Sequence, residues 1–72
     1  MPRKLRELRA DLRRAGFVQD HQTGSHQIWK HDLLPEIPVN VAGNDGADAK
    51  PYQERDVRRA IMRVRSLKGG AP

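Results

Sequence analysis

GSHQIWK at residues 24–30 predicts a glycine turn that leads directly into a β-strand. Glycine readily adopts the positive φ angles that tight hairpin turns require. The strand after the turn carries a histidine, a large aromatic residue and a base, at His26, Trp29 and Lys30. The preceding segment, residues 17–22, begins with phenylalanine and valine and predicts the partner strand. We therefore expect a β-hairpin near the centre of the chain.

The length of the turn decides which face of the hairpin carries His26, because a slip of one residue exchanges the two faces. A two-residue loop at residues 23–24 would pair His21 with His26. A three-residue loop at residues 22–24 would instead pair Asp20 with His26. We predict the three-residue loop, because it also brings the two large aromatic residues of the hairpin together on the core face. His26 would then be exposed, with the Asp20 carboxylate within cross-strand reach.

The same register would put Trp29 in the core and display Lys30 on the face that carries His26. A third strand is predicted over residues 36–41, where large apolar residues alternate with polar residues or proline. Pro38 cannot donate a backbone hydrogen bond, which favours a position at the edge of the sheet. Residues 42–50 contain the sequence GNDG and predict an exposed, mobile loop.

Helices are predicted on both sides of the strands. Residues 2–15 have leucines at helical spacing, with Pro2 suited to the first turn and Gly16 to a left-handed cap. A second helix is predicted over residues 52–68 and should end at Gly69-Gly70. The order helix, three antiparallel strands, helix predicts an α+β fold, a two-layer sandwich with both helices on one face of the sheet.

One small domain spanning residues 1–72 is expected, with a thin core, because only 36% of the residues are hydrophobic. The chain has no cysteine, so disulfide bonds are excluded. The large apolar residues expected in the core are Leu5, Leu8, Leu12, Phe17, Trp29, Ile37, Val39, Val41, Val57, Ile61 and Val64. The apolar face of the second helix should comprise Val57, Ala60, Ile61, Val64 and Leu67.

Basic charge is concentrated in the two end segments. Residues 1–15 and residues 52–72 each hold six basic and two acidic residues, whereas the middle of the chain is acidic. Basic helices can be simple solvated faces, but a net charge of +5 favours a polyanionic partner such as nucleic acid. The sequence has neither a signal-peptide pattern nor an apolar run that could span a membrane. We therefore expect a cytoplasmic protein.

His26 is the candidate catalytic residue. An imidazole exchanges protons near neutral pH and can deprotonate a ribose 2′-hydroxyl, while basic side chains stabilise the phosphate charge. A histidine on a strand is also often a binding or surface group, so this pattern leaves both roles open. His21, His31 and Asp20 lie near the same hairpin, but no ligand spacing encodes a tetrahedral metal site. No metal or other cofactor is expected. Tyr52 could stack on a base or cover the start of the second helix.

Several motifs occur in a fixed order along the chain: a leading basic helix, AGF at residues 15–17, GSH at residues 24–26 followed by WKH at residues 29–31, and VRRAI at residues 57–61. In this order the chain resembles the HicA (YcfA-like) toxins, the ribonuclease halves of bacterial toxin–antitoxin pairs. The resemblance covers nearly the whole chain. One departure is Gln27, where members of the family often carry a second histidine.

The resemblance implies a fold similar to a double-stranded-RNA-binding domain and cleavage of mRNA without a metal. It also implies neutralisation by a HicB-type antitoxin in a hetero-oligomeric complex. The family's catalytic histidine falls on His26, presented by the turn at Gly24 and Ser25. The basic residues expected to contact RNA phosphates are Lys30, Arg6, Arg9, Arg58 and Arg59. Two alternatives stay open: a non-catalytic RNA-binding module of the same fold, and an interaction domain for an acidic protein.

Overall fold

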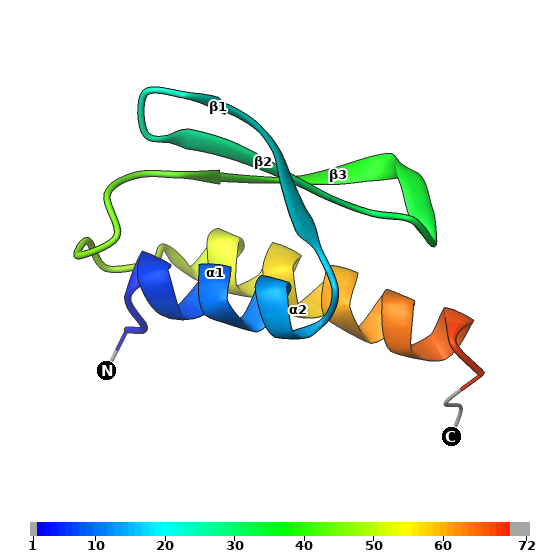
Figure 1. Ribbon diagram of the computed structural model, residues 1–72. Helices are drawn as coiled ribbons and strands as arrows, with labels where there is room; N and C mark the ends of the chain where they lie inside the picture. Colours follow the sequence, from blue (N-terminus) through cyan, green and yellow to red (C-terminus); the bar gives the residue numbers. More distant parts are fainter. Residues whose placement is uncertain (1, 70–72) are drawn as a thin grey trace.

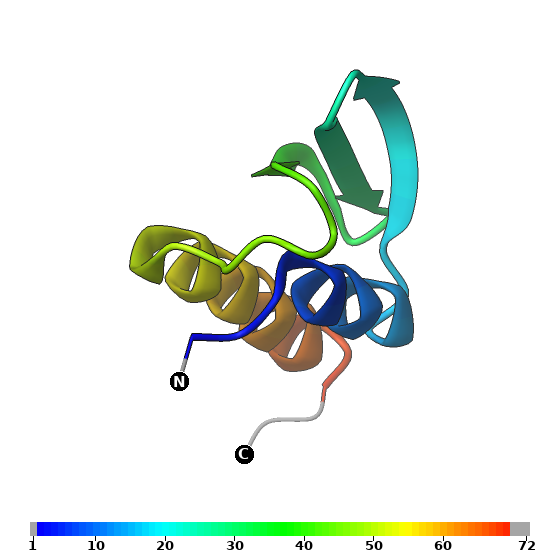
Figure 2. The same ribbon diagram turned by 90° about the vertical axis from the view of Figure 1, so that its left-hand side faces the viewer.

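The computed structural model describes residues 2–69. The elements follow one another as α1 (Leu5–Arg14), β1 (Val18–Thr23), β2 (His26–His31), β3 (Leu34–Ala42) and α2 (Pro51–Leu67). Both helices lie on one face of the sheet, and the opposite face is open (Figures 1 and 2). The predicted α-β-β-β-α order and the two-layer α+β arrangement are confirmed.

The three strands form an antiparallel sheet in the order β1-β2-β3. β3 therefore lies at an edge, as the missing backbone donor of Pro38 predicted. The strand is longer than expected, because it begins at Leu34 immediately after a turn at Asp32 and Leu33. Every residue of β1 is exposed, so the hairpin contributes to the core through β2 and through Phe17, which precedes β1.

The start of α1 differs from the prediction. The helix begins at Leu5, and Pro2 does not form its first turn. The backbone of Arg3 instead accepts a hydrogen bond from Ala49 N at 2.6 Å, and Lys4 forms a bridge with Asp48. The far end agrees with the prediction, since Gly16 follows the helix with a φ of 96°. A distant loop therefore helps to fix where this helix starts, together with a local cap in which Lys4 N donates to Glu7 Oε1 at 2.7 Å.

That loop, between β3 and α2, is exposed over residues 44–48, as predicted, but it also has a structural role that the sequence did not suggest. Its carbonyl groups cap the first turn of α1, because Leu5 N donates to Ala47 O at 2.9 Å and Arg6 N to Asp45 O at 3.1 Å. These amides have no partner within the helix. Ala49 is buried in the core. The loop is therefore a structural part of the helix layer.

The core lies between the sheet and the two helices and contains most of the predicted residues. Its buried apolar members are Leu5, Leu8, Leu12, Phe17, Trp29, Leu34, Val39, Val41, Ala49, Val57, Ala60 and Val64. Ile61 is partly buried against them. The predictions for Ile37 and Leu67 were wrong, because both side chains are about half exposed at 47% and 53%. α2 ends at Leu67 and Gly69 has a φ of 76°, while Gly70 lies outside the described residues.

Candidate functional site

The turn between β1 and β2 consists of Gly24 and Ser25, with Gly24 at a φ of 60°. Thr23 pairs with His26, and Gln19 pairs with Trp29. The predicted three-residue loop and its register are therefore wrong. A register shift between Gln19 and His21 inserts one extra residue into β1, so the hairpin closes with a shorter turn.

The two faces of β2 nevertheless agree with the prediction. Trp29 is 1% exposed and belongs to the core, whereas His26 and Lys30 are exposed. The expected approach of Asp20 to His26 does not occur, because Asp20 sits at the register shift and faces Lys30, with 3.2 Å between Oδ2 and Nζ. Lys30 is also not beside the imidazole, since four residues along a strand span about 13 Å.

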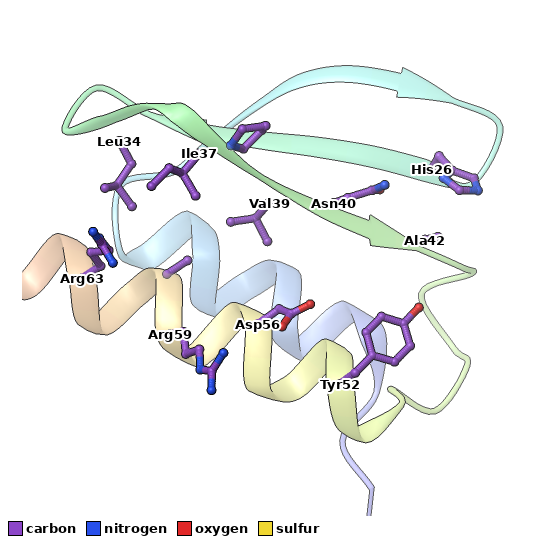
Figure 3. A pocket seen from close by; sticks show the side chains of 12 residues that line it. His26, Leu34, Ile37, Val39, Asn40, Ala42, Tyr52, Asp56, Arg59 and Arg63 are labelled. Atoms are coloured by element: carbon purple, nitrogen blue, oxygen red, sulfur yellow. The ribbon is translucent and has the colours of Figure 1, made fainter.

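His26 lies at one end of a groove of about 520 Å³ along β3 and α2 (Figure 3). Tyr52 rises from the start of α2 near the same end, whereas Arg63 lies at the far end beside Leu34. Arg59 lines the groove between them. Side chains of β3, most of them apolar, form the sheet side of the groove: Leu34, Ile37, Pro38, Val39, Asn40 and Ala42.

The structure separates the predicted RNA-contacting residues into different places. Arg59 shares the groove with His26, whereas Lys30 lines another hollow together with Asp20. Arg6 and Arg58 are exposed on α1 and α2. Tyr52 and Arg63 also line the groove, and neither was predicted as a site residue. No motif in the sequence separates Arg63 from the other arginines of its helix, and for Tyr52 the sequence left open base stacking or a cover over the start of the helix.

Arg9 corrects the prediction of a phosphate contact, because its side chain is buried and surrounded by protein oxygens. The residue is 5% exposed. Its Nη2 donates to Ser25 O at 3.2 Å, Val41 O at 3.2 Å and Gly43 O at 2.7 Å, and its Nη1 donates to Asp45 Oδ1 at 2.6 Å. The guanidinium thus ties α1 to the turn before His26 and to the end of β3.

The other two histidines lie apart from the groove. His31 is buried, its ring lies edge-on to Phe17 with centroids 5.1 Å apart, and its Nδ1 accepts from Leu33 N at 3.0 Å. His21 Nε2 is 3.1 Å from Thr23 Oγ1. Within residues 2–69, no cluster of three or more histidine, aspartate or glutamate side chains could hold a metal ion. The three histidines are therefore not brought together.

A family model described as "HicA toxin of bacterial toxin-antitoxin" matches residues 5–62, from the first residue of α1 into the last turns of α2. No curated protein and no solved structure gives a significant match. None of the helices in the described part of the chain has the length and apolar character needed to cross a membrane.

Proposed function

The chain belongs to the HicA toxin family, whose members are toxins of bacterial toxin–antitoxin systems, and we propose that it acts as an endoribonuclease on mRNA. The observation that carries this proposal is the position of His26. Its exposed imidazole stands at the end of a groove that also holds Arg59 and Arg63. A proton acceptor and phosphate-binding cations thus face the same open space.

In the proposed reaction, His26 takes the proton of a ribose 2′-hydroxyl, and the oxygen attacks the neighbouring phosphorus. The bond from phosphorus to the 5′-oxygen breaks, and water protonates that oxygen. The hydroxide ion that remains takes the proton from His26 and restores the neutral imidazole. The products are a 2′,3′-cyclic phosphate and a 5′-hydroxyl. Arg59 stabilises the added negative charge on the phosphate during the attack. The reaction requires the 2′-hydroxyl, so the substrate is RNA, and it proceeds without a metal.

The exposed basic side chains outside the groove attract RNA over a longer distance. Lys30, Arg6 and Arg58 act through their charge, with a strength that falls as salt rises. Arg9 takes no part, because its guanidinium is buried among protein oxygens. A HicB-type antitoxin neutralises the toxin in the cytoplasm by forming a hetero-oligomeric complex that covers the groove and His26.

The test compares the parent protein with His26→Ala in an RNA cleavage assay that contains a chelator. We expect the variant to lose cleavage and growth arrest while keeping the thermal unfolding transition of the parent. His21→Ala is the matched control, because His21 is an exposed histidine of the same hairpin outside the groove. Cleavage by His26→Ala at the parent rate would refute the assignment. RNA that is bound but left intact by the parent would instead indicate the non-catalytic RNA-binding module.

A further inference from the structure

One face of α2 presents a regular stripe of side chains to β3. Tyr52, Asp56, Arg59 and Arg63 follow one another at intervals of four, three and four residues, which keeps them on one side of a helix. From the first to the last, the stripe extends about 16 Å along the helix axis. Figure 3 shows all four side chains along the groove that begins at His26.

The side chains of this stripe match the parts of a single nucleic-acid strand, with an aromatic ring for a base at one end and two arginines for phosphates at the other. Tyr52 is 49% exposed and lies at the same end of the groove as His26. Arg59 and Arg63 are one helical turn apart, with about 6 Å between their Cβ atoms. Consecutive phosphates along an extended strand have a similar spacing. Proteins bind single strands through this combination of aromatic stacking and a cationic track.

Base-paired RNA fits the groove less well. In a duplex the ring faces of the bases are stacked on one another, so Tyr52 could not reach them. The exposed apolar surface of Ile37 on the opposite wall also suits the ring face of an unpaired base better than a sugar–phosphate backbone. Both walls of the groove therefore favour unpaired nucleotides.

Asp56 adds a constraint on the path of the strand. Its carboxylate lines the groove between Tyr52 and Arg59, and Arg55 Nε lies 3.8 Å from its Oδ1. A phosphate placed opposite this carboxylate would be repelled. The backbone must therefore approach α2 at Arg59 and Arg63 and stay away from it at Asp56.

We propose that this groove is a binding site for about three unpaired nucleotides that span the cleaved bond, with Tyr52 stacked on a base, Arg59 on the attacked phosphate and Arg63 on the next phosphate. The site rests on the proposed nuclease function and specifies its substrate as single-stranded RNA. A stem–loop would be cleaved in its loop and not in its stem.

The test measures binding of the parent chain to a single-stranded 2′-O-methyl RNA, which lacks the hydroxyl needed for cleavage, over a range of salt concentrations. We expect Arg59→Gln and Arg63→Gln each to reduce the slope of log K against log salt by about 0.7. Tyr52→Ala should weaken binding about 5-fold or more. Asp56→Asn should tighten it by up to about 5-fold.

Arg65→Gln is the matched control. Arg65 is an exposed arginine of the same helix, but its side chain lines a different hollow, beside Arg14. It should keep the salt slope of the parent. Slopes that fall equally for Arg65→Gln, Arg59→Gln and Arg63→Gln would overturn the site. So would equal binding of single-stranded and duplex probes with no effect of Tyr52→Ala.

The groove and the nuclease can fail separately. In one outcome, the parent protein cleaves natural RNA while the groove variants bind the probe as tightly as the parent does. That result would refute the proposed nucleotide-binding site and leave the nuclease proposal standing. In the converse outcome, the groove variants lose binding to the probe while the parent protein leaves natural RNA intact. That result would support the nucleotide-binding site and refute the nuclease proposal. Groove variants that bind RNA normally but no longer bind the antitoxin would assign the groove to the protein partner instead.

Discussion

Replacing Arg9 with leucine should destabilise the fold by about 3–5 kcal/mol. The guanidinium donates to the carbonyl oxygens of Ser25, Val41 and Gly43 at 3.2, 3.2 and 2.7 Å. Leucine fills part of the volume but donates no hydrogen bond. Hydrogen bonds to a charged group contribute about 1.5–3 kcal/mol each, and the Val41 contact is fully buried. The expected loss of stability follows mainly from the loss of these hydrogen bonds.

The ion pair of Arg9 with Asp45 contributes much less. The two atoms are 2.6 Å apart, but the Asp45 side chain is 67% exposed, against 6% for that of Arg9. Exposed ion pairs contribute about 0–1 kcal/mol. Asp45→Asn should therefore cost less than about 1 kcal/mol, because solvent screens the carboxylate and the amide oxygen can still accept from Arg9.

Equilibrium unfolding in urea, followed by the fluorescence of the buried Trp29, measures both free energies. A domain of this size has a total stability of about 4–11 kcal/mol, so Arg9→Leu should show a lower midpoint with a short native baseline. Added salt should change the Arg9→Leu difference little, because buried contacts are weakly screened. Equal costs for Arg9→Leu and Asp45→Asn, or a cost below 1 kcal/mol for Arg9→Leu, would refute the reasoning.

Three further predictions concern stability, and thermal unfolding checks each of them. Gly43→Ala should cost about 2–5 kcal/mol, because its φ is 121° and a Cβ there would lie 2.5 Å from Leu5 Cδ1. Gly24→Ala should cost about 1–2 kcal/mol from its positive φ alone, since the structure has open space around that position. Trp29→Ala should cost about 3–5 kcal/mol, whereas Ile37→Ala, at a side chain 47% exposed, should cost less than about 1 kcal/mol. A Tm lowered more by Gly24→Ala than by Gly43→Ala, or as much by Ile37→Ala as by Trp29→Ala, would contradict them.

The sequence predicts the helices and strands where the pattern is local. The apolar spacing of α2 and the proline at Pro51 place its ends within one residue of the observed bounds, 51–67. The start of α1 was harder to predict, because contacts with the backbone of residues 45–49 stabilise it in addition to the local cap by Glu7. Those residues lie about forty positions after the start of α1, and nothing in the local sequence encodes the contact.

The hairpin register could not be predicted from the local sequence, for a similar reason. Phe17 and Trp29 both reach the core, as the sequence suggested. They do so through an extra residue in β1, at Asp20, rather than through a longer turn. A bulge and a turn of different length satisfy the same apolar pattern, so burial alone could not distinguish them. The position of His26 opposite Thr23 follows from that difference.

Only part of the groove that forms the candidate site could be predicted from the sequence. His26 follows from its glycine turn, and Arg59 from the basic charge of the second helix. Tyr52 and Arg63 could have been found from their spacing, since both share one helical stripe with Arg59. Which stripe faces β3 depends on the packing of α2 against the sheet, and the sequence alone did not specify that packing.

Arg9 shows how a break in a pattern can mark a structural link near a site. Leu5, Leu8 and Leu12 form the buried stripe of α1, and the position one residue after Leu8 belongs to the same stripe. An apolar residue there would bury its surface without a hydrogen bond. The arginine instead reaches Ser25, the residue before His26. A charged residue within an apolar stripe therefore indicates buried acceptors nearby, and here those acceptors belong to the segments that flank the catalytic candidate.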